Sequence, residues 1–410
     1  MIKTLWKSTA LLVAFAATSM GATAFGDGFW WDLFNHESDC VQLTATQEYL
    51  FMSRDARLDT GGNVVNGPDA GLLDFDNSDF SHETGYRLSF GIQTPENRIE
   101  AIFAQYGTWF SSDTGSLTAG VAFDGGIPGS WPAGSNSLAA NTFFSPMFVA
   151  ATAELDEAEG LGPNNAFADT LPTYNRTYES QMQDLQINWM NNDPTADLRV
   201  GIGFRNVQLD EMANMMISGA FRAADIAAPN GGLSNATLTG TAGLTFHSTV
   251  PNGIDDQSIL GNNGAPDQLS MSYSAQTSND LNGFQAIVDA CLIDNGRFEL
   301  KLIGRAGAYH NRASGRVQEQ YRAIGSDVSD YRRSFTDSKD SVAFVGGVGA
   351  QGAVRLSDHI RIFAGYQGTF ITGVALSPEQ GAGIRGGIYE VETDGNVIVH
   401  GGNAGLEITY

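Results

Sequence analysis

The stretch Asn396-Val-Ile-Val-His-Gly-Gly-Asn-Ala-Gly-Leu-Glu-Ile-Thr-Tyr410 closes the chain on an aromatic side chain. Every second residue counted back from Tyr410 is apolar or small, namely Ile408, Leu406, Ala404 and Gly402. The residues between them are polar or small. A β-strand alternates its faces with a period of two, so the pattern predicts a strand with one lipid-compatible face and one polar face. A half-buried strand of a soluble protein alternates in the same way.

A terminal strand that ends on its own aromatic residue also resembles the C-terminal assembly signal of bacterial outer-membrane barrels. The residues that carry this resemblance are Gly405, Leu406, Ile408 and Tyr410. The resemblance implies that the barrel-assembly machinery is a partner of this chain.

The N-terminus has the organisation of a secretory signal peptide over residues 1–24. Lys3 and Lys7 form a basic region, an apolar run follows, and Ala22-Thr23-Ala24 supplies a small-residue cleavage site. Residues 25–40 then hold Trp30 and Trp31 among acidic side chains. We expect this aromatic segment to lie in the periplasm, either as a short amphipathic helix at a barrel mouth or membrane interface, or as a partly ordered tail.

Composition narrows the class of protein further. The 410 residues carry a formal charge of −24, a balance unsuited to nucleic acid or to an anionic lipid surface. No apolar run after the signal peptide approaches the roughly 18 residues that a membrane helix needs. An exported chain without such a helix is soluble or forms a closed barrel, because otherwise its backbone polar groups stay unpaired in lipid.

Strands of membrane-spanning length, about 9–13 residues, follow from Val41 onward. Residues 82–93 show the alternation most clearly, whereas the phase of residues 98–110 is ambiguous. The expected strands cover residues 41–53, 82–93, 98–110, 179–190, 198–209, 281–293, 297–310, 341–355, 360–371 and 396–410.

The connections between these strands alternate strictly between short and long. Short ones fall at 94–97, 191–197, 294–296 and 356–359, and long ones at 54–81, 111–178, 210–280, 311–340 and 372–395. Short periplasmic turns and long outer loops are typical of outer-membrane barrels, whereas β-sandwiches lack this parity. We predict an all-β fold: one antiparallel transmembrane β-barrel of about ten strands over residues 41–410, in the outer membrane of a Gram-negative envelope, with lipid as its surroundings. Twelve strands result if Leu269–Ala275 and part of 111–178 join the sheet.

Several segments resemble the β-barrel porin family described mainly in planctomycetes. The resemblance rests on Val200–Glu211, Asn282–Gln285 with Asn295–Leu300, Phe363–Gln367 with Gly373–Gln380, and Asn396–Gly402 with Gly405–Ile408. It covers mainly Val200 to the C-terminus. It implies an outer-membrane barrel fold and location far more than an activity.

The inward phase of these strands carries charges of both signs. The candidate lumen-lining residues are Arg87, Arg199, Arg205, Asp289, Glu299, Lys301, Arg305, Arg361 and Glu407. A ten-stranded barrel is narrow, which favours a salt-bridge network that satisfies buried charge over the lining of a selective pore. Strand register predicts that Asp289 lies opposite Lys301, and that Glu407 lies at the depth of Arg361.

The two cysteines, Cys40 and Cys291, are both expected near the periplasmic rim. The periplasm is oxidising, so we predict a disulfide that pins the aromatic segment at the lumen mouth. A register slip of one residue would turn Cys291 outward.

No zinc-ligand spacing, phosphate loop or nucleophile elbow is present, so we predict no catalytic, metal or cofactor-binding residues and no enzyme activity. The sequence favours a porin-like or structural barrel that passes small solutes through a narrow charged lumen. The alternative is a surface recognition or adhesion barrel whose long outer loops bind a partner or an envelope polymer. A third possibility is an enzyme carried on those loops.

Overall fold

The computed structural model describes residues 41–55, 75, 78, 80–116, 173–192, 197–221, 267–324, 331–385 and 388–410. The predicted signal peptide 1–24, the segment 25–40, Cys40 and much of the long connections lie outside these residues. The chain divides into two compact units, Met1–Gln42 and Leu43–Tyr410, and the second contains the sheet.

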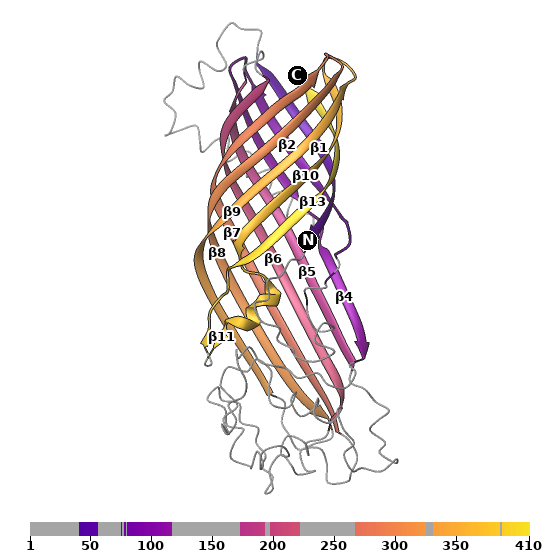
Figure 1. The fold of residues 1–410 in the computed structure, drawn as a ribbon, viewed down its shortest axis with the longest axis vertical. Coiled ribbons are helices and arrows are strands. Elements are labelled where there is room, and N and C mark those ends of the chain that lie inside the picture. The colour runs from indigo at the N-terminus through magenta and orange to yellow at the C-terminus, as the bar shows by residue number, and fades with distance from the viewer. Residues whose placement is uncertain are drawn as a thin grey trace. The chain divides into compact units, whose positions relative to one another are not determined.

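The described strands form one antiparallel sheet that closes on itself (Figure 1). Their order is β3-β2-β1-β13-β10-β9-β8-β7-β6-β5-β4, and a further pairing between β3 and β5 closes the ring. The strands are β1 (Gln42–Asp55), β2 (Glu83–Gln93), β3 (Asn97–Gln105), β4 (Trp109–Ser116), β5 (Thr173–Asn191), β6 (Leu198–Phe221), β7 (Asp267–Asp294), β8 (Phe298–Ile324), β9 (Tyr331–Arg355), β10 (Ile360–Val374) and β13 (Gly395–Thr409).

The predicted ten-stranded closed barrel is confirmed. Strands β3 and β4 both pair with β5 and follow each other along it, so together they occupy one position in the ring. The first and last strands also pair as expected, with Tyr49 opposite Ala404. At this seam, Leu43 and Tyr410 exchange two backbone hydrogen bonds of 2.9 Å each.

One end of the barrel, which we call the turn end, carries the short connections. From there the strands on the two sides of the ring run to very different lengths. Strands β1, β2, β10 and β13 have 14, 11, 15 and 15 residues, whereas β6, β7, β8 and β9 have 24, 28, 27 and 25. The longer strands therefore continue past the shorter ones at the opposite end, the loop end (Figure 1).

This corrects the expected strand bounds on the long side, which were too short. Strand β7 begins at Asp267 rather than at 281, and β9 at Tyr331 rather than at 341. Leu269–Ala275, considered as a possible extra strand, belongs to β7. The expected long connections are shortened by the same amount.

The outward side chains near the turn end form an apolar belt around the barrel. Phe90, Ile202, Phe284, Val348 and Ile362 are all exposed on this face, Phe284 by 74% and Val348 by 73%. A continuous apolar band on the outside of a closed barrel matches the hydrocarbon core of a bilayer. In the part of the chain that the structure describes, no helix is long and apolar enough to cross a membrane.

Beyond the belt, alternate residues still point inward and outward as before, but the inward side chains are now apolar and the outward ones are polar. In β8, Ala313 and Val317 are buried on the inner face, while Arg312 and Arg316 are exposed on the outer face. Strand register aligns a row of polar residues that marks the edge of the belt: Gln208, Asp280, Arg312 and Asp340. We call the parts of β4–β9 past this row the extension. The outer face of the extension is polar and its inner face is apolar, as in a sheet whose outer face is in water.

The connection between β7 and β8 has a different register from the one expected. Asp289 lies opposite Ile303, and Lys301 lies opposite Cys291. The predicted pairing of Asp289 with Lys301 is wrong because Asp294 pairs with Glu299, which places the turn at residues 295–298 rather than 294–296. A β-bulge between Cys291 and Ile293 then shifts the register back by one residue. Gly296 adopts a φ of 83° in the turn, which favours glycine.

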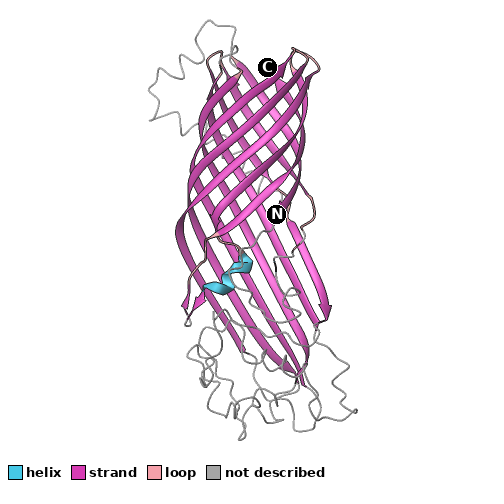
Figure 2. Ribbon diagram, in the orientation of Figure 1, coloured by secondary structure: helices cyan, strands magenta, loops and turns pink. Residues whose placement is uncertain are grey.

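The β10–β13 connection contains the short helix η3 (Ser377–Gly383), shown in cyan in Figure 2, and a small hairpin of β11 (Ile384–Arg385) and β12 (Ile388–Tyr389). Residues 374–380 of this connection are buried, and Val374, Ala375 and Leu376 are completely inaccessible to solvent. Residues 374–380 of the connection therefore pack against the strands of the barrel.

Candidate functional site

Charged side chains fill the lumen at the level of the belt, and we call them the polar layer. Arg87 of β2 donates to Glu48 of the neighbouring strand β1 at 3.0 Å and to Gln367 at 2.8 Å, and the second contact reaches β10, which is not a neighbour of β2 in the ring. The other ion pairs are Arg98–Glu100 at 2.8 Å, Arg205–Asp184 at 2.8 Å, Lys301–Glu299 at 2.6 Å, Arg361–Glu299 at 2.5 Å and Arg361–Glu407 at 2.8 Å.

A cavity of about 110 Å³ lies among these side chains. The predicted lumen residues that line it are Arg87, Arg205, Asp289, Lys301, Arg305, Arg361 and Glu407. Glu299 joins the network through Lys301 and Arg361 but does not line the cavity. Arg199 lies opposite Asp289 and also does not line it.

Sequence analysis missed Arg98 and Glu100, which both line the cavity. The phase of residues 98–110 is ambiguous because both faces carry apolar residues: Ile99 and Phe103 on one, and Ile102 and Ala104 on the other. The spacing of two between Arg98 and Glu100 carried the signal, since residues two apart in a strand share a face. The ion pair at 2.8 Å follows from that spacing.

An apolar layer fills the lumen beyond the polar layer, on the loop-end side. Its largest side chains are completely or almost completely buried: Trp109, Tyr178, Tyr309, Leu50, Met52, Met182, Leu209, Leu281 and Ile371. This layer was not expected from the sequence, which predicted a charged lumen throughout. The reversal of the alternation in the extension places Tyr178 and Leu209 inside, whereas Leu50, Met52 and Ile371 come from the loop-end parts of β1 and β10.

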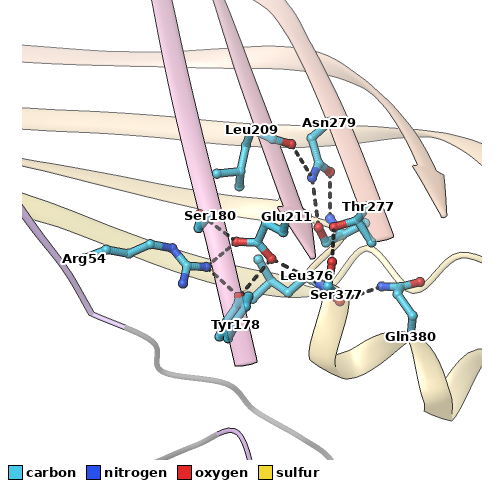
Figure 3. Close-up of polar contacts among 11 residues, drawn as sticks. Arg54, Tyr178, Ser180, Leu209, Glu211, Thr277, Asn279, Leu376, Ser377 and Gln380 are labelled. Carbon is cyan, nitrogen blue, oxygen red and sulfur yellow. Dashed lines mark hydrogen bonds and ion pairs between the residues drawn. The ribbon is translucent and has the colours of Figure 1, made fainter. Parts of the chain in front are cut away.

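Residues 373–380, which we call the plug segment, complete the apolar layer. Asn279 of β7 holds its backbone in both directions: the side-chain amide donates to the Ala375 carbonyl at 2.8 Å, and its oxygen accepts from the Ala375 amide at 2.7 Å. Asn311 of β8 donates to the Gly373 carbonyl at 3.0 Å. The Ser377 and Thr277 hydroxyls are 3.1 Å apart (Figure 3).

Glu211 of β6 joins the plug segment to the rest of the layer (Figure 3). One carboxylate oxygen accepts from the Arg54 guanidinium and from the Ser180 hydroxyl, the latter at 3.2 Å. The other oxygen accepts from the Tyr178 hydroxyl at 2.8 Å and from the Ser377 amide at 3.1 Å. A single carboxylate thus receives four donors from β1, β5 and the plug segment.

Burial decides the charge states in this cluster. The side chains of Arg54 and Glu211 are both fully shielded from solvent. Burial raises the pKa of Tyr178 well above its ordinary value, so its hydroxyl stays protonated and donates. A guanidinium keeps its charge in proteins, and the buried charge of Arg54 is paired with the adjacent Glu211 carboxylate. Arg54 therefore remains a cation that needs Glu211.

The cluster of Glu211, Arg54 and Tyr178 is suited to holding the plug segment in the lumen. Both oxygens of Glu211 are occupied by donors, which leaves no position for a reacting group. His310 and Asp340 approach to 3.4 Å, but this pair is exposed on the outer face. Among the residues that the structure describes, no group of three or more histidine, cysteine or acidic side chains is placed to hold a metal ion.

Cys291 lies near the turn end, where its Sγ is 3.6 Å from the Ile293 carbonyl oxygen. Within the described ranges it forms no disulfide. Its expected partner, Cys40, is outside them, so the disulfide stays a prediction.

No protein-family model matches the chain, and no curated protein matches it. Solved structures do match. Escherichia coli outer membrane protease OmpT is 12% identical with a TM-score of 0.37, over 91% of this chain and 97% of that one. The CymD monoaromatic hydrocarbon channel is 8% identical (TM-score 0.27; 96% of each chain), and the Pseudomonas putida toluene transporter TodX is 8% identical (TM-score 0.24; 95% and 94%). At these values the similarity carries no inference about activity, and the resemblance to the planctomycete porin family stays a prediction.

Proposed function

We propose that this chain is an outer-membrane barrel that does not conduct, and that it acts at the cell surface through its extension. The apolar belt would lie in the membrane, the turn end would face the periplasm, and the extension would project into the medium. The belt and the polar row at its edge support this placement, because a strand has an apolar outer face in lipid and a polar outer face in water.

One observation carries the proposal: the described side chains fill the lumen in two successive layers. The polar layer occupies the level of the belt, where ion pairs join neighbouring strands and Arg87 of β2 also reaches Gln367 of β10. The apolar layer and the plug segment lie on the loop-end side of the polar layer. A continuous water path would have to pass through a close-packed apolar cluster, which stays dry.

The outer surface of the extension is suited to a hydrated partner. A groove of about 590 Å³ crosses it, and its outward-facing side chains include Glu179, Gln181, Asp210, Gln276 and Ser278. Carboxylate, amide and hydroxyl groups in a row can donate to and accept from the hydroxyl groups of a saccharide. This favours the envelope polymer among the partners predicted from the sequence.

Gated passage of small solutes is the second candidate. The observation in its favour is the way the plug segment is held beyond Val374, by side-chain hydrogen bonds from Asn279 and Glu211 rather than by pairing with a neighbouring strand. Such a segment can leave the lumen without breaking the sheet. A solute would then reach the cavity in the polar layer.

Planar-bilayer recording tests the proposal. We expect the purified, heat-modifiable barrel to insert without producing stepwise current across ±100 mV or so, a range in which each 100 mV amounts to about 2.3 kcal/mol per charge. An open porin in the same bilayers provides the control for insertion and detection. Stable conductance steps from the wild-type chain would contradict the proposal, and steps that appear only under voltage would favour the gated alternative.

A further inference from the structure

The cavity in the polar layer gathers cations that the chain otherwise uses sparingly. Only 22 of the 410 residues are lysine or arginine. Six of them line this one cavity: Arg87, Arg98, Arg205, Lys301, Arg305 and Arg361. In a purely structural network each cation is paired with a carboxylate. A cation without such a partner therefore indicates a ligand-binding role for the cavity.

Five of the six cations have a carboxylate within 4.0 Å, and Arg305 does not. The partners are Glu48 for Arg87, Glu100 for Arg98, Asp184 for Arg205, Glu299 for Lys301, and both Glu299 and Glu407 for Arg361. No ion pair joins Arg305 to any carboxylate in the described part of the lumen. Asp289, the nearest acidic residue by register, is two positions from Ile287, which lies opposite Arg305.

Donors without acceptors surround the same cavity. The Nε atoms of Arg87, Arg98, Arg305 and Arg361 are buried, and none has a hydrogen-bond partner among the residues described. A buried donor that lacks an acceptor is costly, and buried guanidinium groups are normally satisfied by a carboxylate, an ordered water or a bound ion. Four such donors around one cavity suit a group that is rich in acceptors.

We propose that this cavity binds a small oxyanion of the phosphate type, with Arg305 as its principal ligand. A guanidinium presents parallel N–H donors that match two oxygens of an oxyanion, and Arg305 is the guanidinium with no such partner. The cavity of about 110 Å³ has room for a small ion with water.

The cavity would be reached from the turn end. Arg98 and Arg361 are each the second residue of their strand, immediately after a short turn, and both line the cavity. The apolar layer blocks the other direction. The oxyanion site is therefore independent of whether the extension binds a partner at the cell surface.

Calorimetric titration of the whole barrel in neutral detergent with inorganic phosphate tests this site. Sodium chloride should hold the ionic strength constant, so that screening alone gives no signal. We expect one phosphate per barrel for the wild type, at least tenfold weaker binding for Arg305→Gln, and partial recovery for Arg305→Lys. Arg312→Gln is the matched control, because it removes the same charge from the exterior of the same strand, and it should bind as the wild type does.

Thermal unfolding separates a ligand site from a structural role of Arg305. Phosphate should raise the unfolding temperature of the wild type and not that of Arg305→Gln. Without phosphate, Arg305→Gln should unfold at or above the wild-type temperature, since it loses a buried unpaired donor. The absence of wild-type binding, equal binding by Arg305→Gln, or a destabilised Arg305→Gln with no phosphate effect on either protein would overturn the proposal. If Arg305→Gln does not fold, Arg305→Lys takes its place, and phosphate should raise its unfolding temperature less than that of the wild type.

Discussion

Replacing Glu211 with alanine should destabilise the apolar layer by about 3–5 kcal/mol, the typical effect of removing one partner of a buried ion pair. The change leaves the buried Arg54 cation without its carboxylate, and removes the acceptor of Tyr178 and of the Ser377 amide. The belt strands pair with one another independently of this cluster. We therefore expect the plug segment to be released while the barrel stays folded.

Limited proteolysis of the folded barrel measures that release. Cleavage within residues 373–394 should become rapid in Glu211→Ala and stay slow in the wild type, with no change in heat-modifiable migration. Asp210→Ala is the control, because it removes a carboxylate from the exposed outer face one residue away. Equal protection of all three proteins would show that Glu211 does not hold the plug segment.

A double substitution sharpens this prediction. Arg54→Leu combined with Glu211→Leu removes both charges and refills the site with apolar volume, which is often neutral or stabilising for a buried pair. The double variant should therefore be less sensitive to protease than Glu211→Ala, although it carries more changes. If the effects of the two single changes simply add, the ion pair does not couple them.

Placing arginine at Val348 should cost about 2–4 kcal/mol of stability in a bilayer, as for a cation at the midplane of a transmembrane barrel. Val348 points outward from β9 and is 73% exposed in the absence of lipid. It lies opposite Gly304 and Gly368, in the middle of the belt portion of its strand. Denaturant titration of barrels refolded into vesicles measures the change.

Ser338→Arg provides the matched control on the same strand. Ser338 also faces outward, but it lies beyond Asp340 and therefore in the extension. It should change the stability very little, because an exposed side chain in water accepts a charge at almost no cost. Equal losses at Val348 and Ser338 would place both at the same depth, which contradicts the assignment of the belt.

The strand number and the closure of the barrel were predictable because they depend on local signals. Alternation identifies each belt strand, and the turn at Asn295-Gly296 is a strong hairpin signal. The extension was not predictable in the same way. In β6, the outward residues past Gln208 include Asp210 and Asn214, so this part of the strand lacks the continuous apolar outer face that identifies a lipid-facing strand. A strand in lipid has an apolar outer face and a strand in water has a polar one, so the pattern that identifies belt strands does not identify the extension.

The contents of the lumen were predictable only in part. The turn at residues 295–298 and the bulge near Cys291 together move the partner of Asp289 from Lys301 to Ile303, a net shift of two positions that keeps both residues on the inner face. That is why both still line the cavity. The plug segment depends on contacts that no local pattern reveals: Asn279 is 96 positions from Ala375, and Glu211 is 166 from Ser377.

Thiol labelling of intact cells tests the closed lumen most directly. Ala313 and Arg312 are neighbours on β8, but Ala313 faces inward and is completely buried, whereas Arg312 faces outward and is exposed. Cysteine would be placed at each position in turn, in a background with Cys40→Ser and Cys291→Ser, and treated with a membrane-impermeant maleimide. A filled lumen predicts rapid labelling of Arg312→Cys and no labelling of Ala313→Cys. Equal labelling of the two positions would mean that water and reagent enter the lumen, and would contradict a filled lumen.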